Sequence, residues 1–382
     1  MQLRTWFLIL SVFWSAAAPC AHTDTSTASD KAFESGVASM CDKDVVLLGE
    51  ASHGDGRTFE VKTRMVEHLI TQCGFTGFFI ESGVYDAIAL SRKFRSGQLV
   101  SAQMISDVIG GIWASSAEIR PLIDRLLIHS NRGAITIGGL DDQVSATAHF
   151  AHDEMISELT SVLVERERDE CASMWKKFLA WNYDAVTPFS RQIQANLRDC
   201  VSRMQASTTQ ATDLSVTTRY ERLLFLTNLD RYASRQRADR PTLLNSRDQS
   251  MYLNLKWLHE RMPARSKVIV WTHNVHAAKS FAGVESLQDR IPLGAHVRKD
   301  YGATSYALGF SALAGQYAAP GAAVKDIPTA PPTSIEAQAL ATNTLEARFI
   351  GTSELNGFGR LPAAIYNYAF REGDWGRVFD GL

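Results

Sequence analysis

The sequence predicts an α/β protein in which a mostly parallel sheet is flanked by helices and interrupted by an all-helical insertion. Three observations carry this prediction. Short β-rich apolar runs alternate with segments of helical periodicity in the first part of the chain, helical periodicity alone follows in the middle, and the alternation returns afterwards. The 382 residues are enough for one large domain or two modest ones with a sizeable core.

The first βα units are clearest near the start of the predicted core. Residues 45–48 form a short apolar run ending in Gly49, and residues 59–73 show helical spacing closed by Gly74. Residues 78–80 then predict a second buried strand. The pattern recurs with a helix and a strand at residues 118–130 and 134–137. Alternation of this kind predicts parallel strands covered by helices on both faces.

The middle of the chain has a different period. Residues 148–240 contain no strand candidate, and long helices are predicted at residues 155–181, 191–204 and 217–234. A helix reaching residue 262 then leads to sheet-like segments at residues 267–271, 304–310 and 347–350, with a loop at residues 318–333. We therefore divide the core into residues 22–147 and 241–382, on either side of the insertion.

The first residues have the pattern of a secretory signal peptide. Arg4 precedes an apolar or small-residue run at residues 6–18 that ends in three alanines. We expect residues 1–21 to be removed and the protein to be periplasmic or secreted, with no membrane-spanning segment afterwards. Anchoring as a lipoprotein at Cys20 ranks second, because Pro19 is a poor residue before a lipidated cysteine.

Export changes how the cysteines are interpreted. Four remain after residue 21, and an oxidising compartment permits disulfides between them. Their order and the short loops they would close predict that Cys41 pairs with Cys73 and that Cys171 pairs with Cys200. The sequence has no C-x-x-C pair, which argues against a structural zinc site.

The charge composition narrows the classes of partner. Subtracting 41 acidic residues from 39 basic residues leaves a net charge of −2, and 45% of the chain is hydrophobic. These values are ordinary for globular proteins, so disorder and charge-driven nucleic-acid binding are poor interpretations. The charge composition therefore does not favour a nucleic-acid partner, and it does not indicate an oligomeric state.

Polar residues follow three of the predicted strands. Glu50 and His53 come after the first, Glu81 after the second, and His273 and His276 after a later one. The carboxyl ends of parallel strands line one crevice, so these side chains are expected to converge. Taken singly, each has an ordinary structural role. Burying all five without mutual pairing would be costly, so a functional site of acids and bases is the better hypothesis.

Together these motifs resemble the erythromycin esterase family. The family has Gly-Glu-x-x-His after its first strand, a Glu after the second and His-Asn-x-His after a later strand, as this chain does. The resemblance continues at Gly138-Gly139-Leu140-Asp141, at Arg247-Asp248-Gln249-Ser250-Met251 and at Phe379-Asp380-Gly381. It implies a metal-independent esterase fold and activity, although distant relatives bind haem or act as metalloproteases.

The resemblance also implies roles for the site residues. His53 would be the general base that activates water, and Glu50 would orient and polarise its imidazole. Lys62, nine residues after His53, falls where the family has a basic residue, and it could neutralise the carboxylates or meet the oxyanion. Positioning water and stabilising the oxyanion would fall to the remaining members of the set, Glu81, His273 and His276.

Three functions therefore remain open. The first is an exported hydrolase that cleaves an ester or lactone without a cofactor; the chain has no Gly-x-Ser-x-Gly motif for an acyl-enzyme serine. The second is a hydrolase dependent on a divalent metal held by Glu50, His53, Glu81 and His273. The third is a non-catalytic relative that binds haem or another ligand. Antibiotic resistance would follow only if the substrate is a macrolide, and the helical insertion carries no substrate signature.

Overall fold

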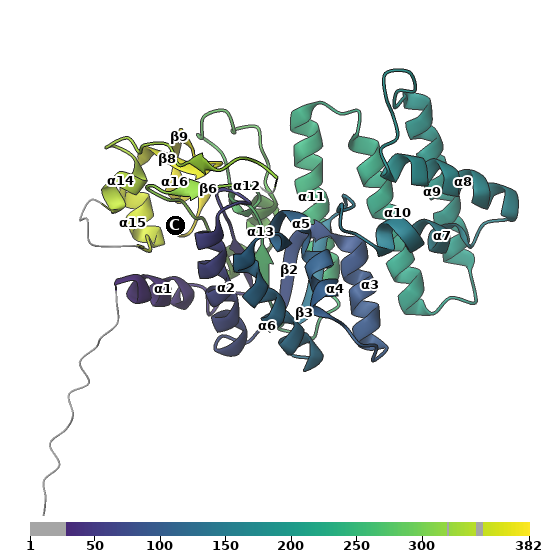
Figure 1. The fold of residues 1–382 in the computed structure, drawn as a ribbon, viewed down its shortest axis with the longest axis horizontal. Helices are drawn as coiled ribbons and strands as arrows, with labels where there is room; N and C mark the ends of the chain where they lie inside the picture. Colours follow the sequence, from purple (N-terminus) through teal and green to yellow (C-terminus); the bar gives the residue numbers. More distant parts are fainter. Residues whose placement is uncertain (1–27, 319–320, 341–346) are drawn as a thin grey trace, which may run out of the picture.

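A five-stranded parallel sheet forms the centre of the molecule (Figure 1). The computed structural model describes residues 28–318, 321–340 and 347–382, so the predicted signal peptide at residues 1–21 lies outside the described residues. The strand order is β3-β2-β4-β1-β5, and every neighbouring pair is parallel. The strands are β1 (Val45–Leu48), β2 (Phe75–Gly83), β3 (Thr136–Asp141), β4 (Lys267–Trp271) and β5 (Ser305–Leu308). The prediction of a mostly parallel sheet is confirmed.

Helices cover both faces of this sheet, so the strand side chains that point to either face are apolar. Val46 and Leu48 face one core, and Val45 and Leu47 face the other. The first core is covered by α1 (Ala28–Ala38), α2 (Gly56–Thr71), α4 (Ala102–Ile109), α5 (Gly111–Ala114), the 3₁₀ helix η1 (Ala117–Ile119) and α6 (Arg120–Asn131). The second is covered by α11 (Arg240–His259), α12 (Asn274–Ala277), α13 (Leu293–Tyr301), α15 (Thr352–Gly357) and α16 (Trp375–Val378).

Helices alone make up the insertion, which lies at one end of the sheet (Figure 1). It contains the π-helix η2 (Phe150–Glu154), α7 (Met155–Thr160), α8 (Glu165–Leu179), α9 (Arg191–Gln210) and α10 (Val216–Arg235). The fold class with its all-helical insertion is therefore confirmed. A third core, which includes Trp175, Phe178 and Phe225, holds these helices together and is joined to the sheet through α3 (Val84–Arg95).

One predicted helix is in fact two. The expected helix at residues 155–181 breaks between α7 and α8. Thr160, Val162 and Val164 are β-branched and lower the local helix propensity. Val164 adopts an extended conformation, with φ −65° and ψ 151°, as the residue before α8. The overall apolar periodicity hides this local interruption.

The C-terminal part holds a hairpin that the sequence analysis did not predict. It consists of β8 (Arg360–Tyr366) and β9 (Ala369–Asp374), and it lies near α14 (Ile335–Ala339) and the two-residue strands β6 (Gln316–Tyr317) and β7 (Lys325–Asp326). The predicted sheet-like segment at residues 347–350 was wrong. Ile350 exchanges backbone hydrogen bonds of 2.9 and 3.0 Å with Leu382 and joins no strand.

None of the described helices combines the length and apolar content that crossing a bilayer requires.

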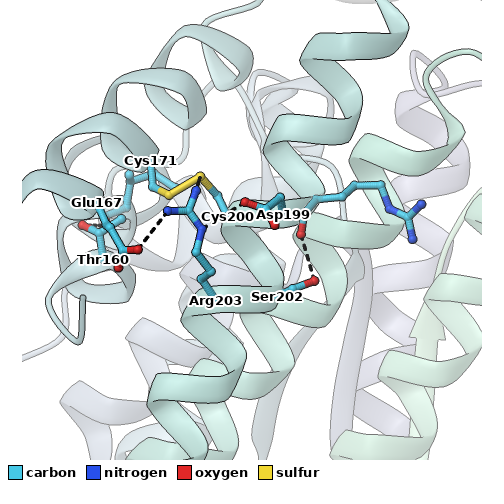
Figure 2. The surroundings of a disulfide bond; sticks show 9 residues. Thr160, Glu167, Cys171, Asp199, Cys200, Ser202 and Arg203 are labelled. Carbon is cyan, nitrogen blue, oxygen red and sulfur yellow. Dashed lines mark hydrogen bonds and ion pairs between the residues drawn. A yellow bond between two sulfur atoms is a disulfide. The ribbon is translucent and has the colours of Figure 1, made fainter. Parts of the chain in front are cut away.

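Both predicted disulfides are present. Cys41–Cys73 ties the segment before β1 to the turn before β2, and Lys267 Nζ donates to the carbonyl oxygens of both cysteines at 2.8 and 3.0 Å. Cys171–Cys200 joins α8 to α9 inside the insertion (Figure 2). Arg203 lies beside this second bridge, where its guanidinium contacts Cys200 Sγ at 3.4 Å.

Removing the second bridge is expected to destabilise the insertion. It closes a loop across a sequence separation of 29 residues, so its loss in a Cys171→Ala/Cys200→Ala variant returns about 3.5 kcal/mol of chain entropy to the unfolded state. Urea unfolding without reductant measures this difference. A reductant should then lower the stability of the wild type more than that of the variant. An unchanged urea midpoint in the variant would contradict the prediction.

Candidate active site

The polar motifs meet at the carboxyl edge of the sheet because β1, β2 and β4 run in the same direction. The loop after β1 begins at Gly49, where a Cβ atom would stand 2.2 Å from Asn274 Oδ1. Asn274 in turn donates to the carbonyl oxygens of Phe310 and Ile365, each at 2.7 Å. The glycine of the first motif and the asparagine of the third are therefore structural, and they hold the two loops in contact.

Glu50 and His53 form a hydrogen-bonded pair at this edge. Glu50 is fully buried, and its Oε1 lies 2.8 Å from His53 Nδ1. The same oxygen accepts a hydrogen bond of 2.5 Å from Trp113 Nε1. The His53 side chain is 29% exposed, and within the described chain its Nε2 forms no hydrogen bond. The carboxylate thus holds His53 by its Nδ1 atom and leaves Nε2 available.

Lys62 is buried behind the carboxylate and not on the open side of the site. Its Nζ donates to Glu50 Oε2 at 2.5 Å and lies 3.9 Å from the centre of the Trp271 ring. Burial lowers the pKa of Lys62 to about 8, and Glu50 opposes that shift. Burial alone would raise the pKa of Glu50, but Lys62 and His53 hold it below its ordinary value. Lys62 therefore neutralises Glu50 and stabilises the ionised carboxylate.

Glu81 is the centre of a second group of contacts. Its Oε2 accepts from Thr272 Oγ1 at 2.7 Å and from the His273 backbone nitrogen at 3.0 Å. Its Oε1 lies 3.0 Å from Arg247 Nη2 and 3.1 Å from His276 Nε2. Burial acts to raise the pKa of Glu81, but His276 and Arg247 hold it well below its ordinary range. Glu81 is therefore a buried anion that joins β2, β4 and α11.

His276 lies between two carboxylates. Its Nδ1 is 2.6 Å from Asp248 Oδ1, and its Nε2 faces Glu81. Burial opposes its charge, yet Asp248 and Glu81 raise the pKa of His276 to about 9. The ring is an imidazolium with both N–H groups donating. His276 and its neighbours form a buried group in which three anions balance three cations. The anions are Glu81, Asp141 and Asp248, and the cations are Arg247, His276 and Arg290.

His273 is neutral and fixed in one tautomer. Its Nε2 lies 3.0 Å from the Ala51 carbonyl oxygen and so donates to it, and its Nδ1 accepts from the Val275 backbone nitrogen at 3.0 Å. Burial and the nearby His53 lower the pKa of His273 to about 3. The His273 ring meets the rings of His53 and Tyr366 edge-on, with centroids 5.1 and 5.3 Å away.

The structure thus brings the sequence-predicted site residues into one connected cluster, Glu50, His53, Lys62, Glu81, His273 and His276. The ring nitrogens of His273 and His276 are both engaged by protein groups, and Lys62 is behind Glu50. None of these three offers a free donor to an oxyanion in this conformation. Among the cluster, His53 alone combines partial exposure with an available ring nitrogen.

Several residues that hydrogen-bond to the cluster were not selected as site residues from the sequence. Arg247 and Asp248 were seen only as part of a family-like motif; Arg247 pairs with the carboxylates of Glu81 and Asp141, and Asp248 pairs with His276. Thr272 immediately precedes the His-Asn-x-His motif and supplies a hydroxyl to Glu81. Trp113 lies in the short helix α5, 63 residues from Glu50, and no local pattern connects the two.

The alternative metal ligands do not converge on a common point. Glu50 and Glu81 accept from lysine, tryptophan, threonine, arginine and histidine donors, and both nitrogens of His273 bond the backbone. Within residues 28–318, 321–340 and 347–382, no group of three His, Cys, Asp or Glu side chains is arranged to hold a metal ion. The set Glu50, His53, Glu81 and His273 therefore does not fit a metal centre as it stands.

The two buried histidines predict a pH dependence of stability. His276, with its pKa raised to about 9, stabilises the fold fully below pH ~6.5 and loses that contribution as pH rises through 9. His273, with its pKa lowered to about 3, resists a proton that the unfolded chain accepts, so stability falls as pH drops from ~6.5 towards 3. The free energy of unfolding should therefore be highest near neutral pH.

Urea unfolding at several pH values measures both limbs. Above pH ~7, where the unfolded histidine has mostly lost its proton, His276 contributes a fall approaching ~1.4 kcal/mol per pH unit, and Lys62, whose pKa is lowered to about 8, opposes this fall as pH nears 8. Comparing the wild type with His276→Gln isolates this slope from other titrating groups. Identical slopes in the two proteins would show that His276 is not charged in the folded state.

Comparisons with known proteins agree with this architecture. The sequence profile of the erythromycin esterase family matches residues 70–364. YbfO of Bacillus subtilis (strain 168), a protein whose name describes it as a hydrolase, is 24% identical to this chain over 348 residues. The match covers 82% of this chain and 75% of YbfO. A crystal structure of a Bacillus cereus protein aligns with a TM-score of 0.70 at 19% identity, covering 94% of this chain and 91% of that one.

Two further solved structures share the fold. A protein described as a succinoglycan biosynthesis protein aligns with a TM-score of 0.71 at 16% identity, covering 94% of this chain and 90% of that one. A point mutant of the erythromycin esterase EreC, in its open conformation, aligns with a TM-score of 0.68 at 15% identity, covering 91% and 92%. The family profile spans well over half of the sequence and includes Glu81, His273 and His276. The chain belongs to the erythromycin esterase family.

Proposed function

We propose that this protein is an exported hydrolase that cleaves an ester or lactone in a small molecule, with water activated by His53. The observation that carries the proposal is the Glu50–His53 pair. A buried carboxylate accepts from Nδ1 at 2.8 Å and leaves Nε2 on the partly exposed side of the ring. A base needs this arrangement to take a proton from water and return it to the leaving alkoxide.

Glu50 makes the reaction electrostatically favourable. When His53 takes a proton it becomes an imidazolium, and an adjacent ionised carboxylate stabilises that charge. Lys62 keeps Glu50 ionised, and the Trp113 N–H fixes the oxygen that faces His53. These two residues therefore act through Glu50 and do not touch the substrate in our proposal.

The Glu81 network would act as a rigid support. Glu81 orients the loop after β4 through Thr272 and the His273 backbone, and His273 donates to Ala51 in the loop that carries His53. Glu81, His273 and His276 are then positioning residues, because their polar atoms already bond protein groups. Preorganisation of this kind lowers the cost of reaching the transition state.

A direct attack by water is favoured over an acyl-enzyme. Ser52 Oγ is 3.3 Å from the Gly54 backbone nitrogen, and within the described chain neither Ser52 nor Ser82 hydrogen-bonds to His53. A serine nucleophile needs a base within hydrogen-bond reach. The carboxylate oxygens of Glu50 and Glu81 and both ring nitrogens of His273 already bond protein groups, which likewise supports a reaction that needs no bound metal.

Export is part of the proposal and rests on different observations. The start of the chain has the pattern of a signal peptide, and two disulfides cross-link the described part of the chain. Structural disulfides of this kind form and persist in oxidising compartments. Cell fractionation of the natural host tests this proposal, and recovery of uncleaved protein in the cytosol would contradict it.

A substrate panel tests the activity. Chromogenic 4-nitrophenyl esters of increasing chain length, simple lactones and a macrolide are incubated with purified protein, with and without a chelator. We expect hydrolysis of an ester or lactone that the chelator leaves unchanged. Loss of activity with chelator, restored by a divalent cation, would favour the metal-dependent alternative. Binding of haem without hydrolysis of any ester would favour the ligand-binding alternative.

A further inference from the structure

One cavity of the described structure is lined by neither Glu50 nor His53. It is enclosed by α1, α2 and the segments around β6 and α14, and its volume is about 610 Å³. Its walls are mostly apolar and include Phe33, Met65, Phe310, Ile335 and Phe349. Cavities of this size and character bind small molecules in other proteins. None of the six predicted catalytic residues lines it.

One carboxylate in its wall is only half satisfied. Glu336 is 4% exposed, and its Oε1 accepts from Ser311 Oγ at 2.6 Å and from the Ala364 backbone nitrogen at 2.7 Å. Its Oε2 is buried and forms no hydrogen bond within the described part of the chain. A buried carboxylate oxygen without a donor is costly, and the usual remedies are a hydrogen bond and a compensating positive charge.

The cations around the cavity do not provide that charge. Three arginines line it, Arg57, Arg64 and Arg348. Each is paired with another carboxylate, respectively Glu60, Asp30 and Glu354. Across the three described stretches of chain, Glu336 takes part in no ion pair. The carboxylate therefore lacks a counter-charge that the protein itself supplies.

We propose that this cavity binds a small molecule with an apolar body and a protonated amine, and that the ammonium group pairs with Glu336. The ammonium would supply the positive charge that the carboxylate lacks, and it would supply an N–H donor to Oε2 once the side chain turns this buried oxygen towards the cavity. The aromatic and aliphatic walls would bury the apolar body. A neutral alcohol of the same shape would supply only the hydrogen bond, and a carboxylate would be repelled by Glu336.

Three probes that share one framework test this charge preference. Isothermal titration calorimetry at pH 7 compares 4-phenylbutylamine, 4-phenylbutanol and 4-phenylbutyrate with the full mature protein. We expect the amine to bind at least tenfold more tightly than the alcohol, and the carboxylate to show no binding. Equal affinities, tighter binding of the carboxylate, or no binding of the amine at millimolar concentration would overturn the proposal.

Substitutions then locate the binding. Glu336→Gln should lower amine affinity at least tenfold and remove the preference over the alcohol. Glu372→Gln is the matched control, because it removes one negative charge from an exposed residue that is outside the cavity wall and forms no ion pair within the described chain, and it should leave affinity unchanged. His53→Ala should also bind the amine as the wild type does, which separates this cavity from the proposed catalytic site.

A cavity-filling variant keeps the test decisive if Glu336→Gln does not fold. Ala32 lies on α1 and lines the cavity, so Ala32→Trp should block it while Glu336 stays intact. Glu34→Trp places the same side chain at an exposed position of that helix and is the control. Amine binding retained in Ala32→Trp would overturn the proposal. The readout is binding alone, so it holds or fails independently of the proposed hydrolysis.

Discussion

Replacing His53 with alanine should lower kcat/KM for ester hydrolysis by about 10²–10⁴-fold while leaving the fold intact. The variant removes the one member of the cluster whose ring nitrogen is available to water. The side chain is 29% exposed, so its loss leaves only a small cavity. Steady-state kinetics on the best chromogenic ester measure the effect, and a thermal melt checks that the variant is folded.

Two comparisons separate a base from a merely structural histidine. His149→Ala changes a side chain that is 75% exposed and should leave the kinetics unchanged. Added imidazole should restore part of the activity of His53→Ala, because a free base can enter the space that the side chain left. Full activity in His53→Ala would transfer the role to His273 or His276, and the protein contacts of those rings would then have to rearrange during turnover.

The cluster illustrates which contacts a sequence can predict. Glu50, His53, Glu81, His273 and His276 follow strands that local periodicity identifies, and the common direction of parallel strands brings their carboxyl ends together. Lys62 was found through the resemblance, because the family has a basic residue at that place in the helix after the first motif. The predictions of Glu50, His53, Glu81, His273 and His276 need only the neighbouring sequence and one rule of topology.

Trp113 shows where that reasoning ends. Its partner Glu50 is 63 residues away, and the contact depends on how α5 packs against α2 and the sheet.

The β8–β9 hairpin was missed for another reason. Its turn places Asn367 and Tyr368 at φ 48° and 54°, where glycine is the usual signal. Tyr368 is held there by its hydrogen bond to Asp55, a tertiary contact that local sequence does not reveal.

Replacing Lys62 with methionine should destabilise the protein by about 3–5 kcal/mol and abolish most of its activity. Among the described residues, Lys62 is the only lysine or arginine that hydrogen-bonds to the fully buried Glu50. Without it, desolvation would raise the pKa of Glu50 and favour the protonated carboxyl, which no longer stabilises a charged His53. Urea unfolding and ester kinetics measure the two effects on the same preparation.

A double variant distinguishes lost charge pairing from lost packing. In Glu50→Gln/Lys62→Met no buried charge is left unpaired, so most of the stability should return, whereas activity should not, because His53 still lacks its carboxylate. Lys256→Met, at a side chain that is 48% exposed, controls for the loss of a lysine and should change stability by no more than about 0.5 kcal/mol. If the double variant is as unstable as Lys62→Met alone, the lysine matters for its packing over Trp271. If Lys62→Met has wild-type stability and activity, Glu50 does not depend on it, and the electrostatic basis of the proposed site fails.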